Sequence, residues 1–339
     1  MDLEARIDVA LHRIHAHTDE NARGFTSHAP MVVDALVALD RADRIDAFLD
    51  AYLPGFPATG PEGPAAECAA EAWGDVLDPG SSWPAALDRA LVELAPSAFA
   101  AATHGLIRVA HAVRGLERAD TPVRRRELAR ALAYWRASHA TLPGTPGAAT
   151  GGHVDAAASI ASLEVVPNDR RKGGLFTESV AVLSEHRPFV DTIERLEIPD
   201  AVDGDAVGEV TRAMLAPYFE SPLLRIAYIH TITAPSALRL VAGHVQPETL
   251  RTLYGYGVQA VAALHAISRL PTAHVLGADV EALAGDGEAL RSRAADTLEE
   301  HVIKFTEACL REHAATGDAR FLLAAADATV AEEQRAAAS

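Results

Sequence analysis

The chain has 339 residues, 49% of them hydrophobic and 23% charged, a composition that supports a globular protein with a sizeable core. Its net charge of −17 argues against a nucleic-acid or anionic-membrane partner. The two cysteines give no disulfide framework, and no run of about 18 apolar residues is present to span a membrane. The N-terminus also lacks a basic, apolar leader, so we expect a cytoplasmic protein.

Helical periodicity dominates the chain. The first half predicts helices over residues 3–14, 30–39, 65–76, 83–95, 97–118 and 122–139. The second half predicts short helices within 155–200 and longer ones over 205–220, 222–243, 247–269 and 279–313. Strand signals are few and short. The pattern therefore predicts an all-α protein.

The helical pattern predicts a single large domain over residues 1–325, built as one unit or as two packed helical halves. Residues 142–153 are rich in Gly and Pro and predict a flexible loop. The Ala- and Glu-rich residues 326–339 predict a weakly ordered C-terminal tail.

The stretch His301-Val-Ile-Lys304 stands out within the helical run 279–313. A helix places residues three apart on one face, so His301 and Lys304 should point the same way. Among the 30 Lys and Arg residues, only Lys172, in a Gly-rich loop, and Lys304 are lysine. A buried lysine can lose its proton and act as a base, form a Schiff base or capture carbon dioxide as a metal-binding carbamate. The alternative is a lysine whose stem covers the core while its charge reaches solvent.

A second polar stripe, His104-Gly-Leu-Ile-Arg108-Val-Ala-His111, lies in the helix expected over 97–118. Spacings of four and seven place His104, Arg108 and His111 on one face, and the rest of this helix is apolar. A helix buried on most sides must direct such residues into a cavity or toward one another. They are either part of a functional site or core histidines beside a buried ion pair of Arg108.

Three more histidines lie in apolar surroundings. His230 precedes Pro235, which removes a backbone donor, and a histidine beside such an irregularity is a reasonable metal ligand. His28 lies just before a helix start opened by Pro30, and His265 lies inside an apolar helix. Each of the three is either a ligand or an ordinary structural histidine.

Familiar chemical motifs are absent. The chain has no His-Glu-x-x-His, no Glu-x-x-His, no Gly-x-Gly-x-x-Gly, no P-loop and no Gly-x-Ser-x-Gly elbow. The scattered histidines instead suggest a buried mononuclear metal site assembled from separate helices. Imidazole suits iron, zinc and other divalent metals.

Four stretches together resemble the questin oxidase-like family over nearly the whole chain. They are Ser27-His28-Ala29-Pro30-Met31, His104-Gly-Leu-Ile-Arg108, His230-Thr-Ile-Thr-Ala-Pro-Ser-Ala-Leu-Arg239 and His301-Val-Ile-Lys304. The resemblance implies an all-helical fold and a non-haem metal held by histidines and a carboxylated lysine. Carried over position by position, it points to the ligands His28, His104, His230, His301 and Lys304. His111 and His265 remain substitute ligands.

That family is associated with oxygen insertion into, or cleavage of, fused-ring aromatic polyketides such as anthraquinones. The resemblance therefore implies a Baeyer-Villiger-type or ring-cleaving oxygenase that uses Fe(II) and dioxygen on a small aromatic substrate. It leaves open whether NADPH is consumed. Arg108 would stabilise an anion formed near the metal, and Lys304 would supply a carbamate oxygen.

Two other classes of protein fit the same residues. One is a metal-dependent hydrolase in which zinc activates a water molecule. The other is a non-catalytic helical binding protein whose histidines belong to the core. The sequence does not fix the oligomeric state, the metal or the exact substrate.

Overall fold

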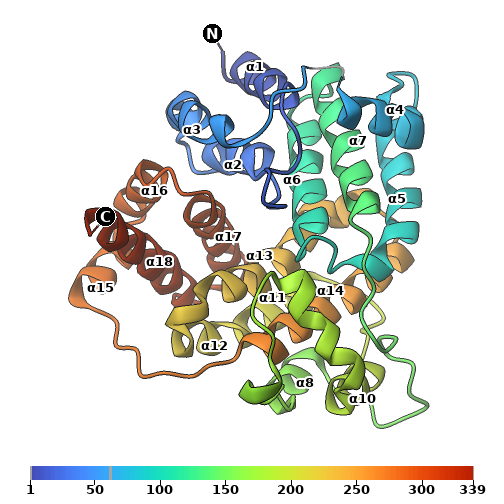
Figure 1. Ribbon diagram of the computed structural model, residues 1–339, viewed down its shortest axis with the longest axis vertical. Helices are drawn as coiled ribbons and strands as arrows, with labels where there is room; N and C mark the ends of the chain where they lie inside the picture. The colour runs from blue at the N-terminus through green and yellow to red at the C-terminus, as the bar shows by residue number, and fades with distance from the viewer. Residues whose placement is uncertain (1, 61–62, 339) are drawn as a thin grey trace.

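The computed structural model describes residues 2–60 and 63–338, and the chain is all-helical across them (Figure 1). The first helices are α1 (Leu3–His15), α2 (Ala29–Ala38), α3 (Ile45–Tyr52), α4 (Pro64–Leu77), α5 (Trp83–Leu94), α6 (His104–Arg118), α7 (Pro122–Ala137), α8 (Ala156–Ser162) and α9 (Phe176–Ser179). The others are α10 (Arg187–Glu194), α11 (Gly204–Ala213), α12 (Leu215–Glu220), α13 (Arg225–Val241), α14 (Pro247–Ser268), α15 (Ala278–Ala284), α16 (Gly287–Asp296), α17 (Glu300–Thr316) and α18 (Arg320–Ala337). No β-strand occurs in the described ranges, which confirms the all-α prediction.

Four helices from distant parts of the chain meet in the interior. Helix α13 packs against α6, α14 and α17, while α2 packs against both α6 and α17. In Figure 1, α4 to α7 lie side by side at one end, and α15 to α18 form the opposite flank. The helices form one compact domain, and its centre lies where α2, α6, α13 and α17 converge.

Helix starts follow from capping side chains and prolines. Asp2, Ser82 and Asp203 each accept a hydrogen bond from a backbone N–H in the first turn of α1, α5 and α11. Proline occupies the first turn of α2, α4, α5, α7, α10 and α14, where its missing N–H costs nothing. These local signals account for the agreement between most predicted and observed helix starts.

The helix expected over 97–118 is shorter than predicted. Residues 101–103 all adopt the left-handed conformation, with φ of 49°, 55° and 75°, and α6 begins only at His104. Left-handed backbone is unfavourable for residues with a Cβ. Helix propensities therefore do not predict three left-handed residues in succession. His104 is therefore the first residue of its helix.

The run expected over 279–313 is also divided, into α15, α16 and α17. Leu298 is left-handed, with φ of 52°, and separates α16 from α17. His301 consequently lies in the first turn of α17, whereas the sequence predicted it inside one long helix over 279–313. Similarly, Met214 separates α11 from α12 within the expected helix 205–220.

Residues 142–153 contain no helical residue, and Gln259 of α14 donates to the carbonyls of Pro143 and Gly144 at 3.0 and 2.8 Å. In the segment 326–339, residues 326–330 are buried within α18 and residues 331–338 are partly or fully exposed. Residues 1, 61–62 and 339 lie outside the described part of the chain.

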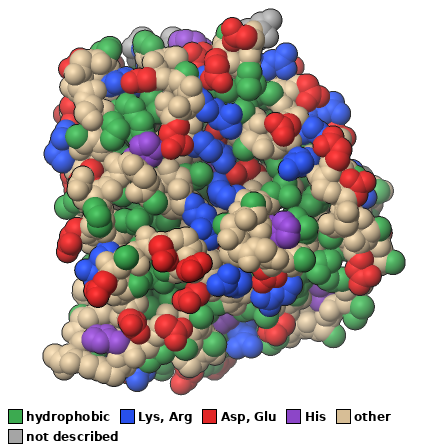
Figure 2. All heavy atoms as spheres, turned by 180° about the vertical axis from the view of Figure 1, so that it is seen from behind, with side chains coloured by type: hydrophobic (Ala, Val, Ile, Leu, Met, Phe, Trp, Pro, Cys, Tyr) green, Lys and Arg blue, Asp and Glu red, His purple; other side chains and the backbone are tan. Residues whose placement is uncertain are grey.

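The surface carries charges of both signs. Figure 2 shows acidic and basic side chains mixed over the face opposite to that of Figure 1. Within the described residues, no helix combines the length and apolar character needed to cross a membrane.

Gly105 allows α6 to approach α7 closely. A Cβ at this position would lie 2.6 Å from Cγ of Trp135, a fully buried side chain that donates to Ser97. We expect Gly105→Ala to destabilise the protein by about 1–3 kcal/mol, because the indole has no room to move. Urea unfolding measures this change. Gly115→Ala on the same helix, where a Cβ would meet nothing within 4 Å, is the matched control, and equal effects of the two substitutions would contradict the packing argument.

Candidate metal centre

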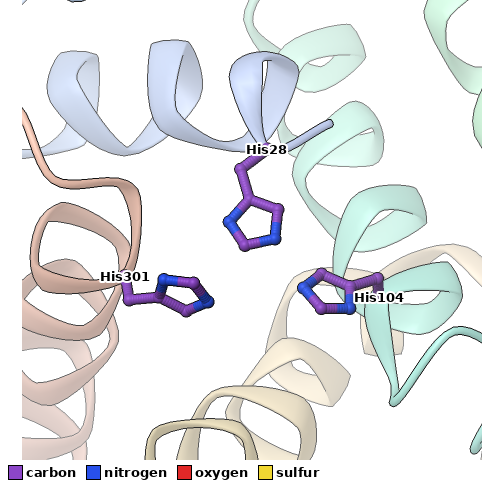
Figure 3. Close-up of side chains that lie close together, drawn as sticks. All are labelled: His28, His104 and His301. Carbon is purple, nitrogen blue, oxygen red and sulfur yellow. The ribbon is translucent and has the colours of Figure 1, made fainter. Parts of the chain in front are cut away.

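Four histidines and one lysine converge where the central helices meet. His28 lies at the start of α2, His104 is the first residue of α6, His230 lies in α13, and His301 and Lys304 share one face of α17. Figure 3 shows the rings of His28, His104 and His301 directed toward a common space. All five predicted ligand residues are thus brought to one place.

The imidazole rings form a closed set of contacts. The ring centre of His28 lies 4.5 Å from that of His104 and 4.6 Å from that of His301. The ring of His230 completes the set, at 4.5 Å from His104 and 5.7 Å from His301. One nitrogen from each of His28, His104 and His301 lies within 4.8 Å of the others. Two nitrogens bound to one metal ion at about 2.1 Å lie at most about 4.2 Å apart. Small movements of the three rings would therefore bring their nitrogens to bonding distance of a shared ion.

The Nδ1 atoms of three rings are held by acceptors. Nδ1 of His104 donates to the carbonyl of Ala101 at 2.5 Å, and Nδ1 of His230 donates to the carbonyl of Ala102 at 2.8 Å. Nδ1 of His301 donates to the carboxylate of Glu299 at 3.0 Å. Because these oxygens only accept, the proton lies on Nδ1 and the lone pair on Nε2. Metal-ligating histidines are commonly oriented by the same kind of bond.

The left-handed turn at residues 101–103 explains two of these bonds. Its backbone directs the carbonyls of Ala101 and Ala102 toward histidines from two different helices. Left-handed residues with a Cβ cost of order 1–3 kcal/mol each and cluster at functional sites, where the surrounding structure holds them. The turn at 101–103 therefore marks a helix boundary directly beside the histidine cluster.

Two Nε2 atoms of this cluster are buried without partners. Nε2 of His104 and Nε2 of His230 are inaccessible to water and accept no hydrogen bond in the described structure. Leaving a buried polar atom unsatisfied costs about 1–3 kcal/mol. Two such atoms facing one space would suit an ion that accepts both lone pairs.

Burial also favours the neutral form of His28, His104 and His230. It lowers the pKa of His28 and His104 well below the usual value, and neighbouring positive groups add to this effect. Burial, with smaller contributions from His301 and Lys304, lowers the pKa of His230 to about 3. Histidine must be neutral to bind a metal ion, and these three histidines would need to lose no proton near neutral pH to do so.

Lys304 is buried beside the histidines. Its side chain is 3% exposed, and within the described residues no hydrogen bond or ion pair holds its Nζ. Burial lowers the pKa of Lys304 to about 8, although the carboxylates of Glu300 and Glu299 act in the opposite direction. The lysine therefore does not snorkel to solvent, which was the alternative interpretation of this residue.

Arg108 lies on α6 but is engaged in a buried ion pair. Its Nε and Nη2 donate to Glu127 at 2.7 and 3.2 Å, and its Nη1 donates to Asp19 at 2.8 Å. Burial would raise the pKa of Glu127, but Arg108 and a hydrogen bond from His15 outweigh it and lower that pKa to about 2. Two carboxylates already neutralise the guanidinium, which favours a structural role for Arg108 over the predicted stabilisation of a substrate anion.

The two substitute ligands have other partners. His111 forms a 2.8 Å hydrogen bond with Asp34, which also pairs with Arg114. His265 forms a 3.2 Å hydrogen bond with the hydroxyl of Tyr228. Neither residue belongs to the cluster of imidazole contacts described above.

Glu299 and Glu300 were not predicted as site residues. Together with His301 they form a second group whose ligand atoms lie within 4.8 Å of one another. Their position directly before His301 in the sequence is a signal that could have identified them. The carbonyls of Ala101 and Ala102 carried no such signal, because their roles depend on the local backbone.

Comparison of the chain with protein-family models and with curated protein sequences gives no match.

Proposed function

We propose that this protein is a mononuclear non-haem metal enzyme, and that its reaction is the oxygenation of a fused-ring aromatic polyketide. The observation that carries the proposal is the convergence of four imidazoles, two of them with buried, unpartnered Nε2 atoms, around Lys304. The resemblance of the four sequence stretches to the questin oxidase-like family supplies the reaction class and the substrate class.

The residues that would hold the ion are His28, His104, His230 and His301, with a carboxylated Lys304 as an oxygen ligand. In that modification the neutral Nζ attacks carbon dioxide, a nitrogen–carbon bond forms, and one proton leaves to solvent, so a carbamate with one negative charge results. Neither step is a redox change. Iron(II) at such a site supplies one-electron chemistry with dioxygen.

The chain's own residues have three tasks in this proposal. The histidines present neutral nitrogens in fixed orientations, set by Glu299 and by the turn at 101–103. The packing of α2, α6, α13 and α17 excludes bulk water from three of the four rings, since His28, His104 and His230 are all buried. Phe176 of α9 lies edge-on to His230, with ring centres 6.5 Å apart, and offers an apolar wall beside the ligands.

A metal-dependent hydrolase is the second candidate. The observation in its favour is the compact group His28, His104 and His301, because three imidazoles with an open position are a common catalytic zinc site. The two candidates differ in one measurable property: the hydrolase turns over without oxygen. The unpartnered Nε2 atoms weigh against the third class, a binding protein with core histidines.

Lys304→Arg tests the lysine ligand. Arginine keeps the positive charge and approximate length but does not form the carbamate, so we expect loss of turnover of hydroxyanthraquinone substrates in air. Oxygen uptake by reconstituted protein is the measurement. Lys172→Arg, at the only other lysine and in an exposed loop, is the matched control and should retain full activity. Unchanged turnover in Lys304→Arg would refute the carbamate.

A further inference from the structure

Two adjacent carboxylates stand on the outer side of the histidine cluster. Glu299 is the N-cap of α17: its Oε2 accepts from the backbone N–H of Val302 at 2.7 Å, and its Oε1 accepts from Nδ1 of His301. One side chain thus fixes both the helix start and the orientation of a candidate ligand. Glu300 follows it, with 27% of its side chain exposed.

His28 is the one histidine of the four whose Nδ1 lacks a partner. The residue is only 4% exposed, and its buried Nδ1 makes no hydrogen bond in the described structure. Oε1 of Glu300 lies 3.9 Å from it, and the same oxygen lies 3.8 Å from Nδ1 of His301. Both separations exceed hydrogen-bond length, yet both are short enough for a modest side-chain rotation to close.

The backbone of His28 is already fixed. Its N–H donates to the hydroxyl of Tyr52 at 2.9 Å, and α2 packs directly against α17. Only the ring remains to be oriented, and the first turn of α17 brings the carboxylate of Glu300 to 3.9 Å from its Nδ1.

We propose that Glu300 is the positioning residue for His28, accepting a hydrogen bond from its Nδ1–H and so directing its Nε2 toward the metal. This inference rests on the proposed function, because it assumes that the cluster binds a metal. It gives each of the four histidines an outer acceptor: the carbonyls of Ala101 and Ala102, and the carboxylates of Glu299 and Glu300. The two carboxylates also place two negative charges beside a divalent cation held by neutral ligands.

The geometry distinguishes this role from direct ligation. Glu300 approaches His28 and His301 from their Nδ1 edges, whereas the nitrogens available to a shared ion are the Nε2 atoms on the other edge. A glutamine at this position retains an oxygen that can accept from Nδ1–H but is a poor substitute for a carboxylate ligand.

The test compares Glu300→Ala and Glu300→Gln with wild type by chelator competition for zinc and, anaerobically, for iron(II). We expect the alanine variant to bind each metal about 10–100-fold more weakly, and the glutamine variant to lose clearly less. Glu281→Ala, on an exposed site of α15, is the matched control. Thermal unfolding of the metal-free proteins should change little, because the partly buried Glu300 side chain makes no hydrogen bond within the described residues.

A double-mutant cycle isolates the pair. In a His28→Ala background, Glu300→Ala should cause no further loss of metal affinity. In the zinc-loaded wild type, long-range proton–nitrogen NMR correlations should show His28 protonated at Nδ1. This signal should shift or broaden in Glu300→Ala, while that of His104 remains.

Wild-type affinity in Glu300→Ala would overturn the inference while leaving the metal site intact. Equal losses in the glutamine and alanine variants would also overturn it, since they would make Glu300 a direct ligand. Failure of the wild type itself to bind metal would instead refute the proposed function.

Discussion

His104→Ala is expected to weaken binding of iron(II) and zinc by more than about 100-fold, because loss of an outer partner alone typically costs 10–100-fold. The ring of His104 is held on one edge, because its Nδ1 donates to the carbonyl of Ala101, and its Nε2 faces the shared space without a partner. Competition with a chromophoric chelator measures the dissociation constant.

The matched control is His265→Ala. This histidine is also buried in an apolar helix, but it bonds to Tyr228 outside the cluster. It should lose some stability and keep its metal affinity. Similar losses of affinity in the two variants would show that the cluster of four is not the metal site.

Arg108→Met is expected to destabilise the protein by about 3–5 kcal/mol while leaving the metal stoichiometry unchanged. Removing the guanidinium leaves Glu127 buried as an uncompensated charge, which is the costly way to break a buried ion pair. Urea unfolding of the metal-free protein is the measurement. Methionine fills much of the same volume, so the effect reports the charge more than a cavity.

Arg187→Met serves as the control for this prediction. Its guanidinium pairs with Asp191 on the surface of α10, where both side chains are largely exposed, and the unfolding midpoint should not change measurably. A loss of turnover in Arg108→Met without a loss of stability would contradict the structural role and restore the catalytic one.

Much of the site could be predicted because its residues break local expectations. Lys304 is one of only two lysines among 30 Lys and Arg residues, and His104 and His230 lie in strongly apolar segments. Such residues are costly to bury without a purpose. The same reasoning could not show that Arg108 lies outside the site. Helical spacing predicts the side of the helix on which a residue lies, but not which residue of a neighbouring helix it contacts.

The helix boundaries show where sequence patterns stop being informative. Residues 97–103 and 297–299 continue an apolar periodicity, yet both segments leave the helix through left-handed residues. The compensation comes from tertiary contacts: the carbonyls released at 101 and 102 bind two histidines, and the break before α17 lets Glu299 cap the helix and bind His301. Local propensity contains none of this information.

The most direct test of the account is the metal content of protein purified without a histidine tag, measured by plasma mass spectrometry beside a His104→Ala/His230→Ala double variant. The account predicts about one divalent ion per chain in the wild type, iron for an oxygenase, and none in the double variant. A wild-type protein that holds no metal after anaerobic reconstitution with iron(II) or zinc would contradict it, and the four histidines would then be structural residues.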